Sequence, residues 1–198
     1  MDGPAGPVRN VPNLITTVRT VVAVGLAVLA VVGDSAVLTG VAIACYWIGD
    51  MADGLAARLL RQETRFGAVY DIVCDRICCL AVAAALIPLL PSMGVPLGIF
   101  VVQFVVVDLV LSLSFLRWPL LSPNYFHLVH TQVYRFNWSP VAKALNTGGL
   151  VLLVVLAPSP VLPVAFTLAI AAVKLASLVA VARIPLAVDL PGLRAASS

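Results

Sequence analysis

The feature that most constrains this chain is a series of six long apolar stretches, at residues 14–33, 36–58, 68–90, 93–117, 140–157 and 160–183. Because a helix of about 20 apolar residues crosses the hydrocarbon core of a bilayer, each stretch is long enough to span a membrane. Hydrophobic residues make up 62% of the chain and charged residues only 11%, against roughly 25% charged in a soluble domain. The composition excludes a soluble fold, and a net charge of +3 is too small to indicate nucleic-acid binding.

Turn-like residues and two polar loops separate these stretches. The turns are Gly33-Asp34-Ser35, Pro88–Gly94 and Pro158-Ser159-Pro160, and the loops are Arg58–Gly67 and Trp118–Ser139. The longer loop could hold a short interfacial helix. We therefore predict an all-α integral membrane protein with six transmembrane helices, forming a single domain over residues 1–198 with a polar N-terminal segment at 1–12.

Basic residues lie at one set of predicted helix ends, whereas the opposite turns carry Asp34 and no Lys or Arg. Because Lys and Arg mark the cytoplasmic side of a membrane protein, we expect both termini and both polar loops in the cytoplasm. An even number of spans requires the termini to share a side, which agrees with this orientation. The residues that define the basic side are Arg9, Arg19, Arg58, Arg61, Arg65, Arg117, Arg135, Lys143, Arg183 and Arg194.

Four carboxylates lie in the second and third spans, where each charge costs at least about 2.5 kcal/mol to insert. Asp50 and Asp53 are three residues apart, so they project from one helix face. Asp71 and Asp75, four apart on the next, antiparallel helix, do the same. Their mutual repulsion requires either protonation or neutralisation by cations. A convergence of four oxygen donors suits two divalent cations, Mg²⁺ or Mn²⁺, which commonly clamp a phosphoryl group during displacement.

Residues near these acids fit a nucleotide ligand. Gly54 and Gly67 remove side-chain bulk where a ligand or a neighbouring helix comes close. Arg58 follows Asp53 by about one turn of the same helix and can bind a phosphate in a bidentate manner. The site is therefore expected to bind a phosphorylated compound.

Together these residues form the pattern Asp50-x2-Asp53-Gly54-x2-Ala57-Arg58-x8-Gly67-x3-Asp71-x3-Asp75. It resembles, position for position, the signature of the CDP-alcohol phosphatidyltransferase family. Eight fixed positions within 26 residues make the signal specific. Six helices and cytoplasmic termini are also typical of that family, so the resemblance covers essentially the whole chain.

The resemblance implies an enzyme of phospholipid biosynthesis that transfers a phosphatidyl group from CDP-diacylglycerol to a hydroxyl acceptor and releases CMP. It implies that Asp50, Asp53 and Asp71 are metal ligands. Asp75 would lie near the metals and also act as the general base that deprotonates the acceptor. The family further implies a homodimer in the membrane, and a cytidine-diphosphate site lined by Gly54, Ala57, Arg58 and Gly67.

A narrower resemblance, to phosphatidylinositol synthases, concerns the acceptor and predicts inositol or inositol phosphate. The similar residues are Val11–Ile15, Arg19, Gln62, Thr64–Ala68, Asp75-Arg76 and Lys174–Arg183. The match fades between Trp118 and Ser139, a loop expected to shape the acceptor pocket. Ser139–Thr147 resembles a segment of glycerophosphate and cardiolipin synthases in the same family, so glycerol 3-phosphate or phosphatidylglycerol is the alternative acceptor.

Other charged residues leave their roles open. On the cytoplasmic side, a phosphorylated acceptor could be bound by Arg117, Arg135, Lys143 or Arg183, although the positive-inside rule predicts the same residues without any substrate. Asp108, in the fourth span, calls for a polar acceptor group or for a partner such as Arg76 or Lys174.

Two other classes of protein make different predictions. A membrane transporter also uses intramembrane carboxylates, but its acids are expected to spread through the depth of the membrane. Here they cluster near one face, with Asp108 as the exception. A catalytically inactive scaffold would be indicated by a damaged motif, whereas all eight positions are intact.

Overall fold

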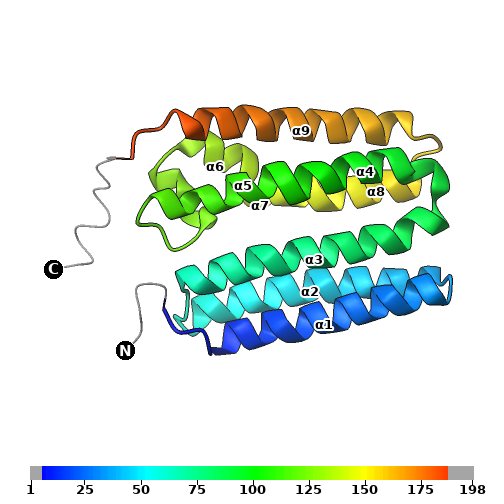
Figure 1. Cartoon of the computed structure of the whole chain (residues 1–198), viewed down its shortest axis with the longest axis horizontal. Helices are drawn as coiled ribbons and strands as arrows, with labels where there is room; N and C mark the ends of the chain where they lie inside the picture. Colours follow the sequence, from blue (N-terminus) through cyan, green and yellow to red (C-terminus); the bar gives the residue numbers. More distant parts are fainter. Residues whose placement is uncertain (1–5, 187–198) are drawn as a thin grey trace.

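The computed structural model describes residues 6–186, and every regular element among them is a helix. Six of its segments are long and apolar enough to cross a membrane, and they run lengthwise through the molecule (Figure 1). They are Val11–Val32 (α1), Ala36–Leu59 (α2), Arg65–Leu89 (α3), Pro91–Arg117, Thr131–Leu156 and Val161–Ala182 (α9). This confirms the predicted all-α membrane fold. Arg194 and the start of the N-terminal segment lie outside the described residues.

The fourth and fifth spans are composite, and each contains a π-helical segment. The fourth consists of Pro91–Met93 (η1), Gly94–Val102 (α4), the π-helical Gln103–Asp108 (η2), Leu109–Leu113 (α5) and Ser114–Arg117 (η3). Between the spans lies Pro123–Leu128 (η4). The fifth consists of Thr131–Asn137 (α6), Pro140–Lys143 (α7), the π-helical Ala144–Gly149 (η5) and Leu150–Leu156 (α8). Because π-helical segments frequently occur at functional sites, η2 and η5 are candidate positions for functional residues.

The fifth span differs most from the prediction, which placed it at 140–157. In the structure this span starts at Thr131, and a turn at Trp138-Ser139 separates α6 from α7. Pro140 explains the turn, because proline lacks the N–H that would continue α6. The short interfacial helix expected in the long loop corresponds to α6, preceded by η4.

Two helices begin a few residues earlier than the apolar stretches predicted, because polar residues cap their starts. Asn10 accepts a hydrogen bond from the Asn13 backbone N–H at 2.9 Å, and Thr64 accepts one from Gly67 at 2.9 Å. Each cap satisfies a backbone donor at the start of its helix. As a result α1 and α3 begin at residues 11 and 65, which places Asn13 and Gly67 in first turns that lie next to each other.

The helices form two groups, α1–α3 in one and α4, α8 and α9 in the other (Figure 1). Small residues let α1 pack closely on α2, since Ala23, Ala27 and Ala30 are buried along one face of α1 and Ala42 is buried on α2. In membrane proteins, close helix packing of this kind contributes van der Waals contact where apolar side chains gain little by leaving lipid.

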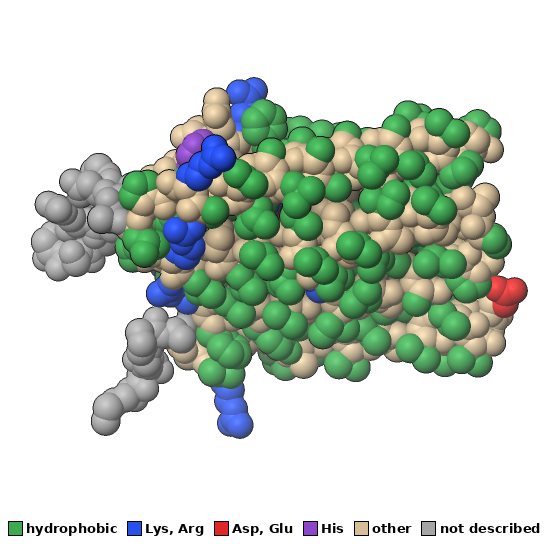
Figure 2. All heavy atoms as spheres, turned by 45° about the horizontal axis from the view of Figure 1, so that its top comes forward, with side chains coloured by type: hydrophobic (Ala, Val, Ile, Leu, Met, Phe, Trp, Pro, Cys, Tyr) green, Lys and Arg blue, Asp and Glu red, His purple; other side chains and the backbone are tan. Residues whose placement is uncertain are grey.

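The outer surface fits a lipid environment. Large hydrophobic side chains are exposed along all six spans, and they cover the body of the molecule in Figure 2. Lys and Arg side chains gather toward one end, and a single acidic group is seen at the opposite end. The protein is therefore a multi-pass integral membrane protein.

Candidate active site

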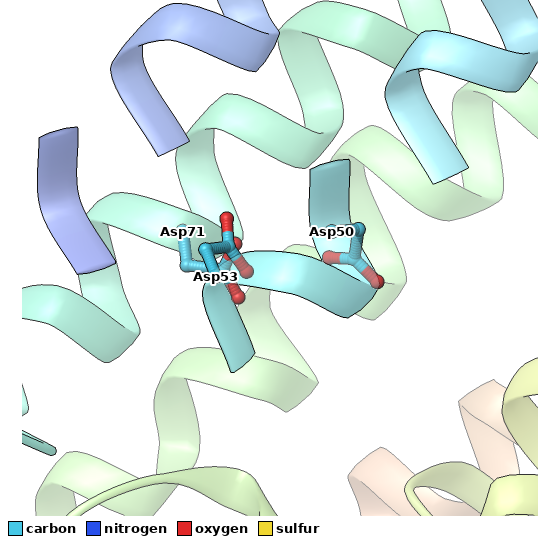
Figure 3. Close-up of side chains that lie close together, drawn as sticks. All are labelled: Asp50, Asp53 and Asp71. Atoms are coloured by element: carbon cyan, nitrogen blue, oxygen red, sulfur yellow. The ribbon is translucent and has the colours of Figure 1, made fainter. Parts of the chain in front are cut away.

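The predicted acids meet where α2 approaches its end and α3 has just begun. One carboxylate oxygen from each of Asp50, Asp53 and Asp71 lies within 4.8 Å of the others (Figure 3). Asp53 is buried, whereas the Asp50 side chain is 44% exposed. Asp75 is not part of this group of three, but it contacts the same cation as they do. The spacing argument thus correctly brought acids from the two helices together.

That cation is Arg19, from the third turn of α1. Its Nε donates to Asp53 Oδ2 at 2.7 Å. Its Nη2 donates to Asp71 at 2.5 Å and to Asp75 at 3.0 Å, and it lies 3.5 Å from Asp50. The Arg19 side chain is only 2% exposed. Arg19 was predicted to be one of the basic residues at the cytoplasmic helix ends, and the four carboxylates hold its side chain inside the bundle.

Neighbouring residues explain how α1 carries a guanidinium into this position. A Cβ on Gly49 would lie 2.5 Å from the Cβ of Arg19, so only glycine on α2 allows this approach. Thr16, one turn before Arg19, donates to Asp53 Oδ2 at 2.7 Å. The burial of Arg19 had one signal in the sequence. Thr16 and Arg19 precede Ala23 at helical spacing, so these polar residues lie on the same face of α1 as its buried alanines.

The four predicted nucleotide-binding residues line one cavity together with the four acids. A Cβ on Gly67 would lie 2.9 Å from Asn13 Oδ1, so this glycine permits the close contact between α1 and α3. At Gly54 a Cβ would meet only the Arg58 guanidinium, at 3.4 Å. Gly54 therefore leaves the cavity side of α2 open. Gly54, Ala57, Arg58 and Gly67 all lie on the same side of the cavity as the acids.

The cavity has two chemically different walls. The acidic wall comes from α2 and α3 and consists of Asp50, Asp53, Asp71 and Asp75. The polar wall comes from α3 and the later helices and consists of Arg76, Asp108, Ser112, Asn137, Asn146 and Lys174. The cavity has a volume of about 230 Å³ and opens to solvent at its mouth. This is somewhat smaller than the roughly 300–1,000 Å³ typical of a small-ligand pocket.

The expected partners of Asp108 are both present in the polar wall. Asp108 Oδ2 accepts from Arg76 at 2.5 Å, and Oδ1 lies 2.5 Å from Lys174 Nζ. Arg76 also donates to Ser112 Oγ at 3.2 Å and to the Ile72 carbonyl at 3.0 Å. Asn137 and Asn146 were not singled out from the sequence, because Asn137 lies in the loop where the resemblance fades and Asn146 is a neutral residue of an apolar span.

Polar contacts connect loops at the mouth of the cavity. Tyr125, in η4, donates to Glu63 at 2.7 Å, and this hydrogen bond, with partial burial, raises the pKa of the Tyr125 hydroxyl. Lys143 donates to Asn124 Oδ1 at 2.8 Å. Of the four basic residues considered for a phosphorylated acceptor, Lys143 lines the cavity. Arg117 instead donates to the Val181 carbonyl at 2.9 Å and holds the end of α9.

The donor set of the acidic wall fits a divalent metal ion. Mg²⁺ and Mn²⁺ prefer carboxylate oxygens, and three such oxygens converge within 4.8 Å. Arg19 contacts the same three carboxylates, so they are oriented before any ligand arrives. Thus the wall can hold a hard cation and place it beside a bound phosphate.

An intramembrane acidic site of this kind defines a class of membrane protein that handles phosphorylated ligands. The sequence profile of the family described as CDP-alcohol phosphatidyltransferase matches residues 9–180, and the chain belongs to that family. Comparison with curated proteins and with solved structures gave no match.

Membership settles the class of activity. The family consists of enzymes that transfer substituted phosphate groups from a CDP-alcohol to an alcohol acceptor, and it is known to use divalent metals. The protein is therefore a phosphatidyl-transferring enzyme rather than a transporter. The grouping of Asp50, Asp53, Asp71 and Asp75 around one cavity agrees with this conclusion.

Proposed function

We propose that this enzyme transfers the phosphatidyl group of CDP-diacylglycerol to the hydroxyl of inositol or inositol phosphate. The acceptor oxygen attacks the phosphorus bonded to the lipid, the bond to the bridging pyrophosphate oxygen breaks, and CMP leaves. The observation that carries this proposal is the convergence of Asp50, Asp53 and Asp71 in one cavity of a member of this family.

In this proposal Asp50, Asp53, Asp71 and Asp75 hold two divalent cations, Mg²⁺ or Mn²⁺. Bound cations would neutralise the charge that develops on the transferred and departing phosphates. Arg19 orients the same carboxylates through its contacts of 2.5 to 3.5 Å. Removal of the metal with a chelator is expected to abolish CMP release, and activity that survives thorough chelation would contradict the metal role.

Asp75 is the proposed general base. Its carboxylate lies outside the group of three close acids and accepts one hydrogen bond from Arg19, at 3.0 Å. It also precedes Arg76 of the polar wall, so it lies where the two walls meet. A hydroxyl between the walls can therefore transfer its proton to Asp75 as its oxygen bonds to phosphorus.

The nucleotide is proposed to lie on α2, against Gly54, Ala57 and Arg58, with Gly67 facing it from α3. The open side of Gly54 supports a close approach of the ligand to the backbone. Arg58 supplies a guanidinium that suits bidentate contact with a phosphate.

A neighbouring apolar cavity supports a lipid-linked donor. Its lining includes Val82, Leu86 and Phe100, and it shares Tyr46, Trp47 and Thr147 with the main cavity. A head group in the main cavity therefore lies next to an apolar pocket of about 40 Å³, whose lining has the polarity that acyl carbons prefer. This continuity favours CDP-diacylglycerol over a donor without acyl chains.

Lys143 supports a phosphorylated acceptor. It lines the mouth of the cavity and contacts only a neutral amide oxygen among the described residues, that of Asn124. Lys143→Met is expected to raise the KM for inositol phosphate several-fold while leaving the KM for inositol unchanged. An equal change for both acceptors would contradict a phosphate contact.

The orientation and assembly are proposals as well. The end of the bundle that carries most Lys and Arg residues (Figure 2) would face the cytoplasm, with both termini and the active site on that side. The exposed apolar surface would contact lipid and a second copy in a homodimer. Protease or thiol-labelling accessibility in sealed vesicles tests the orientation directly.

CMP release by the purified protein with CDP-diacylglycerol and Mn²⁺ or Mg²⁺ tests the acceptor. The panel is inositol, inositol phosphate, glycerol 3-phosphate, serine and phosphatidylglycerol, supplied one at a time. Release with inositol or its phosphate is expected. Release only with glycerol 3-phosphate or phosphatidylglycerol would keep the mechanism and replace the acceptor with the alternative that Ser139–Thr147 suggested.

A further inference from the structure

The polar wall carries an unbalanced charge inside the bundle. Arg76 and Lys174 both pair with the single carboxylate of Asp108, at 2.5 Å in each case. All three side chains are at most 8% exposed. Two cations and one anion leave one positive charge without a direct partner in this group. Buried ionic groups are stable when further hydrogen bonds satisfy them, so the remaining polar atoms of this wall are informative.

Three buried polar atoms of the wall lack a hydrogen-bond partner among the described residues, and one of them, Asp108 Oδ1, instead forms the ion pair with Lys174. Asn137, which is 3% exposed, donates through Nδ2 to Ser177 and to the Val133 carbonyl at 2.8 Å, whereas its Oδ1 has no partner. The Nε of Arg76 also has none. Since nearly all buried polar groups in proteins are hydrogen-bonded, these atoms indicate a polar ligand in the cavity that both residues line.

The types of polar group on this wall suit hydroxyls better than phosphate. The groups of this wall outside the ion pairs are neutral, as hydroxyl groups are: Asn137 offers Oδ1 as an acceptor, Asn146 offers an amide, and Ser112 offers a hydroxyl that already contacts Arg76 and Asp108. The two cations are already engaged by Asp108. A phosphate would instead find its cation at the mouth, where Lys143 contacts only the Asn124 amide oxygen among the described residues.

We propose that the polar wall is the subsite for a polyol acceptor, and that Asn137 is a specificity-determining residue within it. Asp108 holds Arg76 and Lys174 in place, and Asn137, Asn146 and Ser112 bind hydroxyls that do not react. The reacting hydroxyl of the same molecule then faces Asp75, which precedes Arg76 on α3. This inference rests on the proposed function and adds the chemical class that the acceptor site selects, an alcohol with several neighbouring hydroxyl groups.

The test uses the purified full-length protein with CDP-diacylglycerol, Mn²⁺ and either myo-inositol or glycerol 3-phosphate as acceptor. Asn137→Leu keeps the approximate volume and removes the amide, so we expect a KM for the acceptor about tenfold higher. The KM for CDP-diacylglycerol is expected to stay within about twofold, because the donor occupies the other wall. Thr167→Val is the matched control, since this buried α9 hydroxyl bonds only to its own helix.

A second variant keeps the test informative if Asn137→Leu does not fold. Ser112→Ala removes one hydroxyl, leaves the ion pairs intact, and is expected to raise the acceptor KM about threefold. An active wild type whose acceptor KM is unchanged in both variants would overturn this inference alone. Transfer to serine but to no polyol would also overturn it. If the wild type releases no CMP with any acceptor, the proposed function fails, and this inference fails with it.

Discussion

The two walls of the cavity differ in how far apart their residues lie in the sequence. The acidic wall comes from two consecutive helices, within 26 residues of sequence, and its carboxylates share Arg19 from the helix just before them. The polar wall draws Arg76, Asp108 and Lys174 from three helices that are far apart in the chain. The first wall is a local motif, whereas the second depends on the packing of the whole bundle.

In the proposed mechanism the two walls have different tasks. Carboxylates at fixed helical spacing would hold the metal ions that handle the phosphates, and the polar wall would select the acceptor. A wall assembled from distant residues can change one side chain at a time without disturbing those carboxylates. Substitutions in the two walls should therefore have distinct effects: metal binding and turnover on one side, acceptor binding and bundle stability on the other.

The largest effect is expected in the acidic wall. Asp71→Asn removes a carboxylate from the group of three, and CMP release should fall by about 10³-fold because transition-state charge is no longer stabilised. Mn²⁺ binding, followed by electron paramagnetic resonance, should weaken in parallel. Asp34→Asn, at the opposite end of the bundle, is the control and should change neither quantity. Normal Mn²⁺ binding in Asp71→Asn would remove this residue from the ligand set.

Asp75→Asn is expected to lower turnover while leaving the binding of metal and donor largely unchanged. Loss of the general base should lower kcat by about 10²–10⁴-fold. Binding of Mn²⁺ and of CDP-diacylglycerol should be largely retained, because the three close acids are unchanged. Binding experiments on the inactive variant measure this directly. If binding disappears together with turnover, Asp75 is a ligand first and its assignment as the base is wrong.

Arg19→Met tests the cation that organises the acidic wall. Removing one partner of a buried ion-pair group costs about 3–5 kcal/mol, so the Tm in the presence of EDTA should fall clearly. Added Mn²⁺ should raise the Tm of this variant more than that of wild type, since it would be the remaining cation for four carboxylates. Equal stabilisation of both proteins by Mn²⁺ would show that Arg19 and the metal act independently.

Asp108→Asn is the corresponding change in the polar wall and should have the smallest effect on metal binding. Arg76 and Lys174 would then be left without their carboxylate, which should destabilise the fold by about 3 kcal/mol. Mn²⁺ affinity should match wild type. The double variant Asp108→Asn/Lys174→Met, which restores the net charge of the group, should recover part of the lost Tm. A fall in Mn²⁺ affinity would mean that the two walls are coupled.

The two walls also differ in how much of each could be predicted from the sequence. Hydropathy predicted five of the six spans to within three residues, and helical spacing predicted the meeting of acids from α2 and α3. The burial of Arg19 escaped prediction because the rule that assigns basic residues to the cytoplasmic side does not distinguish a surface charge from an intramembrane partner. Asn137 and Asn146 escaped because their importance depends on contacts between segments distant in sequence.

The position of Arg19 in the chain has a consequence for biosynthesis. The first helix leaves the ribosome before the acids do, so a guanidinium is already in the membrane when α2 and α3 arrive with four carboxylates between them. Each of those charges would be costly to insert alone, and pairing with Arg19 lowers that cost during synthesis. The order of residues along the chain thus provides a binding partner for each acidic helix at the moment it enters the bilayer.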